Sequence, residues 1–255
     1  MNHPVPALLP LPAALMCGCL LTCACHAATL HGMRADRILF LGNSITLHGV
    51  HEPYGWLNYC GMAASVPEKD YVHQLVARID AVTGGHLRIS PSDDAEPANI
   101  INVADILERQ YVTYTNDRLR KQIDSKPDLV ILQFGENTPR EGFDPAAFKT
   151  AVQTLTDGLR DSSNAQMFVV SQLLGAGGAL DDTKREVCAE DPSHRVFVDL
   201  SDFGKDPTNL ARSEPYYTGI ITGHPGDKGM ARIAEALFDA MIAHAEAQKA
   251  PPAGQ

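Results

Sequence analysis

Short hydrophobic runs alternate along the chain with longer stretches in which hydrophobic residues recur every three or four positions. The runs at 37–41 and 128–134 predict strands buried on both faces, and Pro127 introduces the second of them. Over 70–82, hydrophobic side chains at helical spacing predict an amphipathic helix. The same criteria predict further strands at 99–103, 166–173 and 195–200, and further helices at 106–123 (continuous or interrupted), 145–159 and 226–247.

This alternation of strands and helices is typical of a parallel α/β sheet covered by helices. Two long segments interrupt it: 47–67 holds aromatic residues and glycines, and 175–182 is rich in Gly and Ala. In doubly wound sheets ligands bind beyond the carboxyl ends of the strands, where such connecting segments lie. No internal repeat or linker divides the chain, so we predict a single domain over 28–255.

The first residues of the chain predict export. Residues 7–25 carry no charge and are mostly hydrophobic, and Cys25-His26-Ala27 resembles a small-residue cleavage site. We therefore predict a signal peptide over 1–27 and a periplasmic or extracellular location. The segment is short and rich in Pro for a membrane span, so we expect no stable membrane insertion after processing. A lipoprotein is less favoured, because no Leu-x-Gly/Ala-Cys box precedes the cysteines.

Composition narrows the possible functions. Hydrophobic residues make up 44% of the 255, and the formal net charge of -10 disfavours nucleic-acid binding, which needs clustered Lys and Arg. Four of the six cysteines lie in the predicted signal peptide. Cys60 and Cys188 remain, and both one disulfide and two buried thiols stay open. No His/Cys cluster indicates zinc, and no cofactor is expected. The last residues, from about 249, predict a disordered tail, and the sequence sets no oligomeric state.

Three polar residues stand just after predicted strands or just before the last predicted helix. Ser44 ends the turn Gly42-Asn43-Ser44, which can expose its hydroxyl and its N–H at the edge of the sheet. Asn137 follows the clearest strand, and its amide can donate to an oxyanion. His224 precedes the closing helix, and imidazole is the usual proton acceptor for a serine. Each residue alone is more often structural, but the order Ser, Asn, His indicates nucleophilic catalysis.

These residues resemble the SGNH/GDSL hydrolases, a family of esterases, lipases and carbohydrate deacetylases. Residues 42–46 are similar to the family's first sequence block, 135–137 to the third, and His224-Pro225 with the following Asp-Lys-Gly to the fifth. The resemblance spans about 37–240. The segments 44–49, 61–65 and 69–73 are similar to those of an exported bacterial branch of the family. It implies a three-layer α/β/α sandwich with a flavodoxin-like parallel sheet of about five strands. It also implies Ser44 as nucleophile, His224 as base, and the Ser44 N–H and Asn137 amide as oxyanion donors.

Two positions depart from the family pattern. The second block, 102–105, has no Gly to complete the oxyanion hole, although the backbone N–H near Ala104 remains available. Ile221 stands where the family has the Asp of the triad. Some other group must hold the imidazole in the right tautomer. Two groups are favoured as this partner of the imidazole: a backbone carbonyl near Ile221, which would give a Ser-His dyad, and the Glu214 carboxylate. Asp227 is less favoured, because it suits a helix N-cap.

The segment after Ser44 supplies candidates for substrate binding. His48 and Trp56 are expected to line the cleft, together with Glu52 and Tyr54, and such groups suit a sugar surface. The leading hypothesis is a serine esterase that hydrolyses a small ester, favouring acetyl, on a small molecule or an acetylated glycan. The alternatives are a carbohydrate O-acyltransferase that uses the same site and a non-catalytic glycan-binding domain.

Overall fold

The computed structural model describes residues 27–85, 87–91, 98–175, 177–213 and 219–249. The predicted signal peptide, apart from Ala27, lies outside these residues, and so do Glu214 and the predicted tail after 249. Within the described part of the chain, no helix is long and hydrophobic enough to cross a bilayer.

A five-stranded parallel sheet forms the middle of the molecule, with the strand order β4-β3-β5-β6-β7. All five predicted strands are present. Because β4 and β5 lie on opposite sides of β3, the winding of the chain reverses at β3, and a crevice opens beyond the carboxyl end of that strand. The strands are β3 (Ile38–Gly42), β4 (Ile100–Asn102), β5 (Leu129–Gln133), β6 (Gln166–Val170) and β7 (Arg195–Val198).

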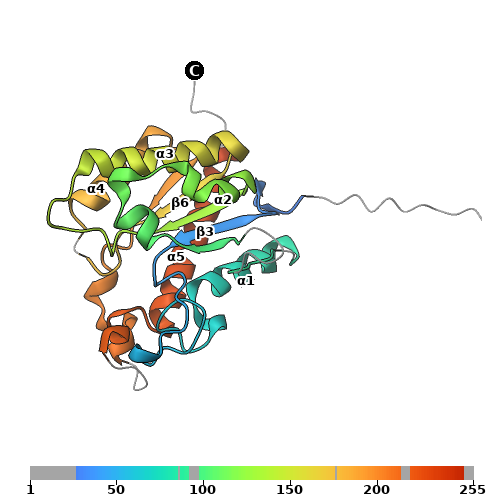
Figure 1. Ribbon diagram of the computed structural model, residues 1–255. Coiled ribbons are helices and arrows are strands. Elements are labelled where there is room, and N and C mark those ends of the chain that lie inside the picture. Colours follow the sequence, from blue (N-terminus) through green and yellow to red (C-terminus); the bar gives the residue numbers. More distant parts are fainter. Residues whose placement is uncertain (1–26, 86, 92–97, 176, 214–218, 250–255) are drawn as a thin grey trace, which may run out of the picture.

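Helices cover both faces of the sheet (Figure 1), so the predicted three-layer sandwich is confirmed. Successive residues of β3 belong to two hydrophobic clusters: Phe40 lies in the cluster that includes Leu237 of α5, and Leu41 in the cluster that includes Val152 of α3. Both faces of the strand are therefore buried, which explains its continuous hydrophobic run. On one face lie α1 (Tyr71–Thr83) and α5 (Asp227–Lys249), and on the other α2 (Arg120–Asp124), α3 (Pro145–Ser163) and α4 (Ala179–Glu190).

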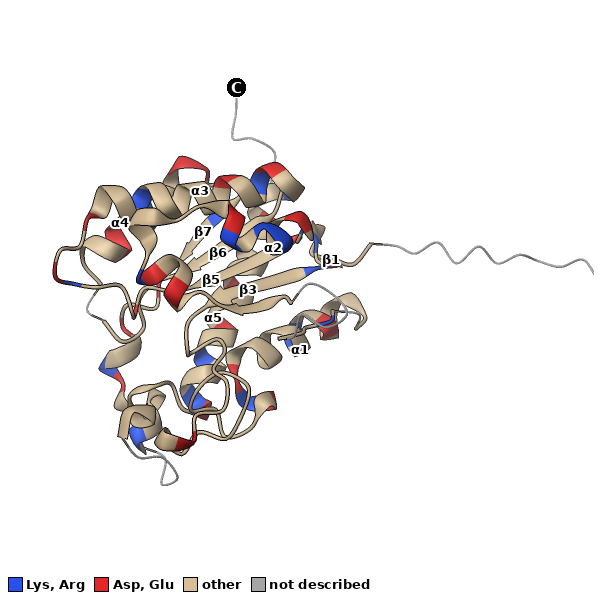
Figure 2. Cartoon of the chain, viewed as in Figure 1, with Lys and Arg blue, Asp and Glu red and all other residues tan. Residues whose placement is uncertain are grey.

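Side-chain caps begin two of the predicted helices. Asp70 accepts a hydrogen bond from the His73 N–H at the start of α1. Asp144 accepts from two N–H groups at the start of α3, where Pro145 occupies the first turn. Lys and Arg positions are interspersed with Asp and Glu positions along the helices in this view (Figure 2).

The predicted helix over 106–123 is interrupted. A π-helical segment, η3 (Ala104–Glu108), is followed by 3-10 turns and only then by the short α2. The run 111–115 consists of aromatic and β-branched residues, which lose side-chain freedom in a helix, and Tyr111 and Tyr114 are buried in the cluster on that face. Among the described residues, the 3-10 turns are Glu52–Tyr54, Pro67–Lys69, Tyr111–Thr113, Asn116–Leu119, Phe203–Lys205, Pro207–Asn209, Ala211–Ser213 and Gly219–Gly223.

Helix α4 has no counterpart among the predicted helices. Its buried face includes the polar residues Asp181, Thr183 and Lys184 beside Val187, so the hydrophobic periodicity is weak. Cys60 and Cys188 are separate buried thiols, which resolves the alternatives for the two cysteines. Burial raises the pKa of each thiol to about 12.

A small hairpin precedes the sheet, with β1 (Thr29–Leu30) paired to β2 (Met33–Arg34). Leu30 is fully buried in the same cluster as α1 and α5. The Ala28 N–H donates to Asp36 Oδ1 at 2.6 Å. The chain is therefore tied to the body of the domain from its first described residues.

Candidate active site

Ser44 lies in a tight turn directly after β3. The Asn43 carbonyl accepts from the N–H groups of Thr46 and Leu47, both at 3.0 Å, and its side-chain oxygen accepts from the Ile45 N–H. The turn needs glycine at 42, because a Cβ there would lie 2.7 Å from the Gln133 carbonyl oxygen. The sequence therefore folds so that the Ser44 hydroxyl stands at the crevice beyond β3.

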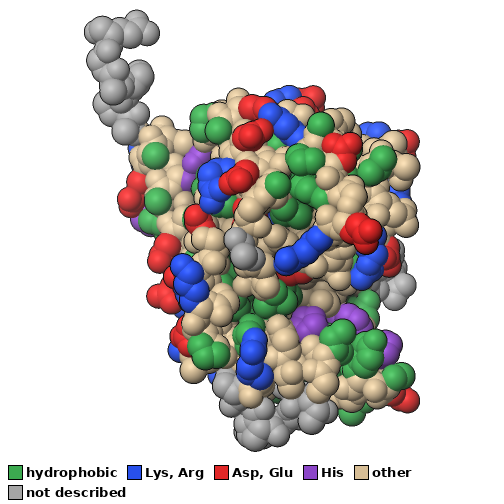
Figure 3. Space-filling view, turned by 90° about the vertical axis from the view of Figure 1, so that its left-hand side faces the viewer, with side chains coloured by type: hydrophobic (Ala, Val, Ile, Leu, Met, Phe, Trp, Pro, Cys, Tyr) green, Lys and Arg blue, Asp and Glu red, His purple; other side chains and the backbone are tan. Residues whose placement is uncertain are grey.

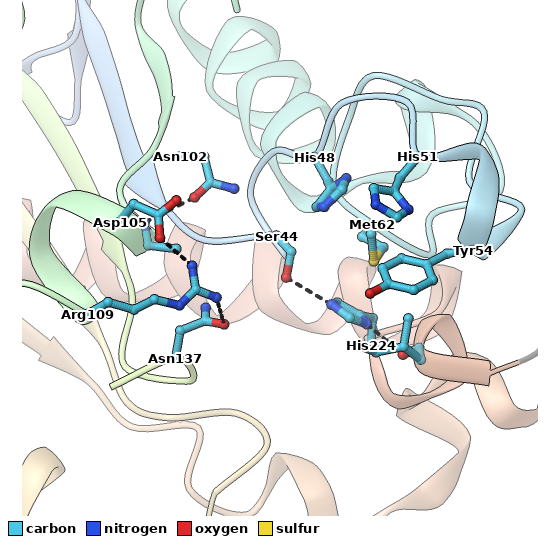
Figure 4. Close-up of a pocket in the computed structure, with 12 residues that line it drawn as sticks. Ser44, His48, His51, Tyr54, Met62, Asn102, Asp105, Arg109, Asn137 and His224 are labelled. Carbon is cyan, nitrogen blue, oxygen red and sulfur yellow. Dashed lines mark hydrogen bonds and ion pairs between the residues drawn. The ribbon is translucent and has the colours of Figure 1, made fainter. Parts of the chain in front are cut away.

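His224 faces Ser44 from the segment before α5 (Figure 4). Its Nε2 lies 2.9 Å from Ser44 Oγ, and its Nδ1 lies 3.1 Å from the Ile220 carbonyl oxygen. A carbonyl only accepts, so Nδ1 carries the hydrogen and Nε2 is left to accept from the serine hydroxyl. Burial lowers the pKa of His224 and outweighs the carbonyl hydrogen bond, which raises it. The imidazole is thus neutral and correctly oriented to take a proton.

The backbone carbonyl of Ile220 therefore holds the imidazole. It lies one residue before Ile221, the position near which the sequence predicts such a carbonyl. Ile221 is buried, and its carbonyl accepts from the His224 backbone N–H at 2.9 Å. Asp227 accepts from the N–H and hydroxyl of Ser65, at 2.8 and 2.7 Å.

Ser44 and His224 open into a cavity of about 530 Å³ with two different walls (Figure 4). Figure 3 shows a group of histidine side chains beside exposed hydrophobic ones on one face of the molecule. Ile220 also lines the cavity. We call the two walls the polar wall (Asn102, Ala104, Asp105, Arg109 and Asn137) and the histidine wall (His48, His51, Tyr54 and Met62).

Trp56, which the sequence predicts to line the cleft, is not among the residues that line this cavity, whereas His48 is. The indole is 1% exposed, packs in the core cluster beside α1 and α5, and donates from Nε1 to the His48 carbonyl at 3.2 Å. Its large hydrophobic surface favours the core, so it supports the histidine wall from behind. The placement of Trp56 as a substrate contact is corrected accordingly.

Asn137 lies in the polar wall with its amide fixed at both ends. Its Nδ2 donates to Glu108 Oε2 at 2.6 Å, and its Oδ1 accepts from Arg109 Nη2 at 3.0 Å. A primary amide has two N–H groups, so one remains for a ligand in the cavity. Glu108 and Arg109 together decide which end of the amide is the donor.

Glu108 was not recognised in the sequence as a site residue. Its carboxylate is fully buried and also accepts from Asn43 Nδ2 at 3.0 Å and from the Gly135 N–H. The sequence held one indication of its position: Glu108 stands at helical spacing from Ala104 and Leu107, and all three residues face inward. The carboxylate therefore joins the turn at Ser44 to the segment that carries Asn137.

A second acid, the half-buried Glu136, lies beneath the same turn. It accepts from Asn43 Nδ2 at 2.7 Å and from the Leu173 N–H at 2.8 Å. Burial raises the pKa of Glu136, and burial lowers the pKa of the nearby Lys184. Glu136 therefore supports the turn at Ser44 from below and is not part of the cavity lining.

The backbone donors of the site differ in availability. The Ala104 N–H, which the sequence suggests as a possible oxyanion donor, already donates to Asn102 Oδ1 at 3.0 Å. The Ser44 N–H has no hydrogen-bond partner among the described residues.

No group of three His, Cys, Asp or Glu side chains in the described ranges is arranged to hold a metal ion. The arrangement is suited to acyl transfer through Ser44.

No protein-family model and no curated protein matches the chain, but several solved structures resemble it. TesA superposes with a TM-score of 0.51 at 17% sequence identity, covering 81% of this chain and 98% of TesA. A two-domain esterase (CEX) active on acetylated mannans, co-crystallised with mannopentaose, gives a TM-score of 0.50 at 13% identity. That match covers 83% of this chain and 50% of CEX.

The psychrotrophic esterase EstA from Pseudoalteromonas sp. gives a TM-score of 0.49 at 14% identity, covering 81% of this chain and 96% of EstA. At these identities the likeness concerns the fold. The matches to TesA and CEX confirm the SGNH hydrolase fold that the sequence motifs predict.

Proposed function

We propose that the protein is a serine esterase that hydrolyses small acyl esters with Ser44 as nucleophile and His224 as base. The observation that carries the proposal is the 2.9 Å contact between Ser44 Oγ and His224 Nε2 at the floor of an open cavity. A serine needs such a base to be an effective nucleophile, and the fixed tautomer of His224 provides it.

The reaction proceeds in two acyl-transfer steps. Ser44 Oγ attacks the ester carbonyl carbon while its proton passes to His224 Nε2. The Ser44 N–H and the free N–H of the Asn137 amide stabilise the negative oxygen. The ester C–O bond then breaks, and the imidazolium returns the proton to the leaving alcohol. Water, deprotonated by His224, attacks the acyl-enzyme and releases the free acid and Ser44.

The Ile220 carbonyl takes the place that an aspartate holds in a triad. It keeps the Nδ1 hydrogen in place but carries no full negative charge, so it stabilises the imidazolium less than a carboxylate would. We therefore expect a Ser-His dyad with modest turnover. Because burial lowers the pKa of His224, the base stays neutral into mildly acidic solution.

The lining of the cavity favours a polar substrate such as an acetylated carbohydrate. One wall offers amide and guanidinium groups, and the other offers two imidazoles and the exposed ring of Tyr54, a combination that suits sugar hydroxyls and sugar faces. The activity of CEX on acetylated mannans supports this substrate class. With its predicted signal peptide, the enzyme would meet such a substrate outside the cytoplasm.

The test is hydrolysis of p-nitrophenyl acetate and of acetylated xylan by the wild type, Ser44→Ala and His224→Ala. Both variants are expected to lose at least about a thousandfold in kcat. His31→Ala, a histidine of the β1–β2 turn outside the cavity, serves as the control and should keep full activity. Undiminished hydrolysis by Ser44→Ala would refute the proposal.

Product analysis separates hydrolysis from the two alternatives. An esterase releases free acetate from acetylated xylan, whereas an acyltransferase makes a newly acylated sugar. A non-catalytic glycan-binding domain makes neither product, and a fluorophosphonate probe would not label Ser44. We expect free acetate and labelling at Ser44.

A further inference from the structure

The segment 61–65 runs beside the turn that carries Ser44, and the reaction described above assigns it no role. The Met62 N–H donates to the Ser44 carbonyl at 2.8 Å. Gly61 lies so close to the same turn that a Cβ on it would be 2.5 Å from the Ile45 carbonyl oxygen. We call 61–65 the bridging segment, because its two ends contact different parts of the site.

Asp70, the N-cap of α1, holds the Gly61 end of the bridging segment. The residue is 1% exposed, and its Oδ2 accepts from the Gly61 N–H at 3.2 Å. Its Oδ1 accepts from the His73 N–H at 2.8 Å. The two carboxylate oxygens therefore have separate tasks: one caps the helix, and the other fixes the residue that precedes Met62.

Asp227 holds the opposite end of the bridging segment. Its Oδ1 accepts from the Ser65 N–H, and its Oδ2 accepts from the Ser65 hydroxyl. Asp227 is the first residue of α5 and stands three positions after His224. The two bonds to Ser65 therefore tie the bridging segment to the part of the chain that carries the base.

The bridging segment connects two residues that are far apart in the sequence. Ser44 and His224 are separated by 180 positions, yet their side chains meet at 2.9 Å. A path of hydrogen bonds runs from the Ser44 carbonyl through the bridging segment to Asp227. Proton transfer depends steeply on such a contact, since a misplacement of about 1 Å can cost about a hundredfold in rate.

We propose that Asp70 and Asp227 are positioning residues for the reaction at Ser44. Each holds one end of the bridging segment, and the segment keeps the Ser44 turn and the start of α5 at the spacing that brings Ser44 Oγ to His224 Nε2. Neither carboxylate is part of the cavity lining. The inference rests on the proposed esterase function, because it concerns the rate of that reaction.

Asp70→Ser tests the Gly61 end, with kcat and KM measured on p-nitrophenyl acetate. Serine can still cap α1, but it is too short to accept from the Gly61 N–H as well. We expect kcat to fall about tenfold with little change in KM. Asp144→Ser, the same change at the N-cap of α3, is the matched control and should keep full kcat.

The His73 ring requires a second control, because its Nδ1 also lies 2.8 Å from Asp70 Oδ1. His73→Gln removes the ring but leaves Asp70 Oδ2 on the Gly61 N–H, so kcat should stay unchanged. A loss in His73→Gln as large as that in Asp70→Ser would refute the role of the Gly61 contact.

Asp227→Ala tests the opposite end, where both bonds to Ser65 are lost. We again expect kcat to fall about tenfold at constant KM. Asp206→Ala removes a different contact to the first turn of α5, the ion pair with Lys228 at 3.0 Å, and should keep full kcat. Ser65→Ala is a milder change at an exposed residue, and the loss of the hydroxyl alone should lower kcat about two- to threefold.

The double variant Asp70→Ser/Asp227→Ala distinguishes positioning from two independent structural effects. Because both residues hold one segment, releasing either end frees it. We therefore expect the double variant to lose about tenfold in kcat, whereas independent effects would multiply to about a hundredfold. Multiplied losses, or an unchanged kcat in both single variants, would overturn the proposal.

Backbone amide NMR signals keep this test separate from the test of the proposed function. A wild type that hydrolyses no ester would refute the esterase function, while the hydrogen-bond path could still be measured. The Ser44 and Met62 signals should shift in Asp70→Ser and in Asp227→Ala, and stay in place in Asp144→Ser. Ser44 signals that do not move in either variant would overturn the inference whatever the activity.

Discussion

The two walls of the Ser44 cavity are held in place in different ways. In the polar wall each polar side chain is bonded to a neighbour, as when Glu108 and Arg109 fix both ends of the Asn137 amide. In the histidine wall, the His51 ring stacks on Tyr54 with centroids 4.1 Å apart, and no described residue forms a hydrogen bond with its buried Nδ1.

This difference separates two tasks in one cavity. Donors that stabilise a transition state must be oriented before the reaction begins, so that no reorganisation is needed. Side chains that contact the rest of the substrate can adapt to it. We therefore expect changes in the polar wall to lower kcat, and changes in the histidine wall to raise KM.

The largest expected effect comes from removing the oxyanion donor of the polar wall. Asn137→Ala should lower kcat by about 100- to 1000-fold with little change in KM, the usual cost of losing one such donor. Asp117→Ala, a change to an exposed acidic residue outside this cavity, is the control and should cost less than about threefold. Steady-state kinetics on p-nitrophenyl acetate measure both. A variant Asn137→Ala with more than half of the wild-type kcat would show that the wall is not part of the machinery.

Next in size is the loss of the carboxylate behind that donor. Glu108→Gln keeps the shape of the side chain but replaces one carboxylate oxygen, which accepts hydrogen bonds, with an NH₂ group, which donates them. An NH₂ group facing Asn137 Nδ2 cannot accept its hydrogen bond, so the Asn137 amide loses its fixed orientation. We expect kcat to fall about tenfold and the free energy of unfolding to fall by about 1–3 kcal/mol, because N–H groups that Glu108 accepts from lose their partner. Urea unfolding and kcat measured on the same sample distinguish the two effects. Reduced stability with an unchanged kcat would make Glu108 a structural residue alone.

In the histidine wall, Tyr54→Ala should raise KM for an acetylated glycan by about three- to tenfold and leave kcat unchanged. The ring offers a stacking surface worth about 1 kcal/mol. Tyr59→Ala removes a similarly exposed ring from the same segment, outside the cavity lining, and is the matched control. Equal KM values for the two variants would remove Tyr54 from the substrate contact.

The smallest expected effect links the histidine wall to the base. Activity needs neutral His224, so kcat/KM should rise with pH as this imidazole loses its proton, with a midpoint below the ordinary histidine pKa of about 6.5. Burial is the main cause of that lowered pKa, and positive charge on His48 lowers it further. His48→Gln removes this charge, so the pKa of His224 rises and the midpoint moves to higher pH. A pH–rate profile of the variant would contradict this if its midpoint moved to lower pH or did not move.

The sequence was informative wherever a site residue adjoins a recognisable strand or helix end. Ser44 and Asn137 directly follow hydrophobic strands, and parallel strands bring their carboxyl ends to one edge of the sheet. Their proximity to each other could therefore be predicted without knowing any distance, whereas the place of His224 beside them was implied by the resemblance to the SGNH/GDSL hydrolases. The roles of these residues in catalysis remain predictions until the variants are measured.

Groups whose position depends on packing could not be predicted in this way. Trp56 lies in a segment without periodicity, so the sequence did not show whether its indole faces solvent or the core. Glu108 acts through contacts with residues 27 to 65 positions away. The carbonyl that orients His224 belongs to the backbone, which every residue has, so no residue type marks it.

The hydrogen bond at the first described residues has a consequence for maturation. Cleavage after Ala27, as predicted, would turn the Ala28 N–H into an ammonium group 2.6 Å from the Asp36 carboxylate. An amide contact would thereby become a charge-assisted ion pair in a nearly buried position. Removal of the leader would then strengthen a contact that the uncleaved chain already makes, anchoring the new chain end beside the hairpin.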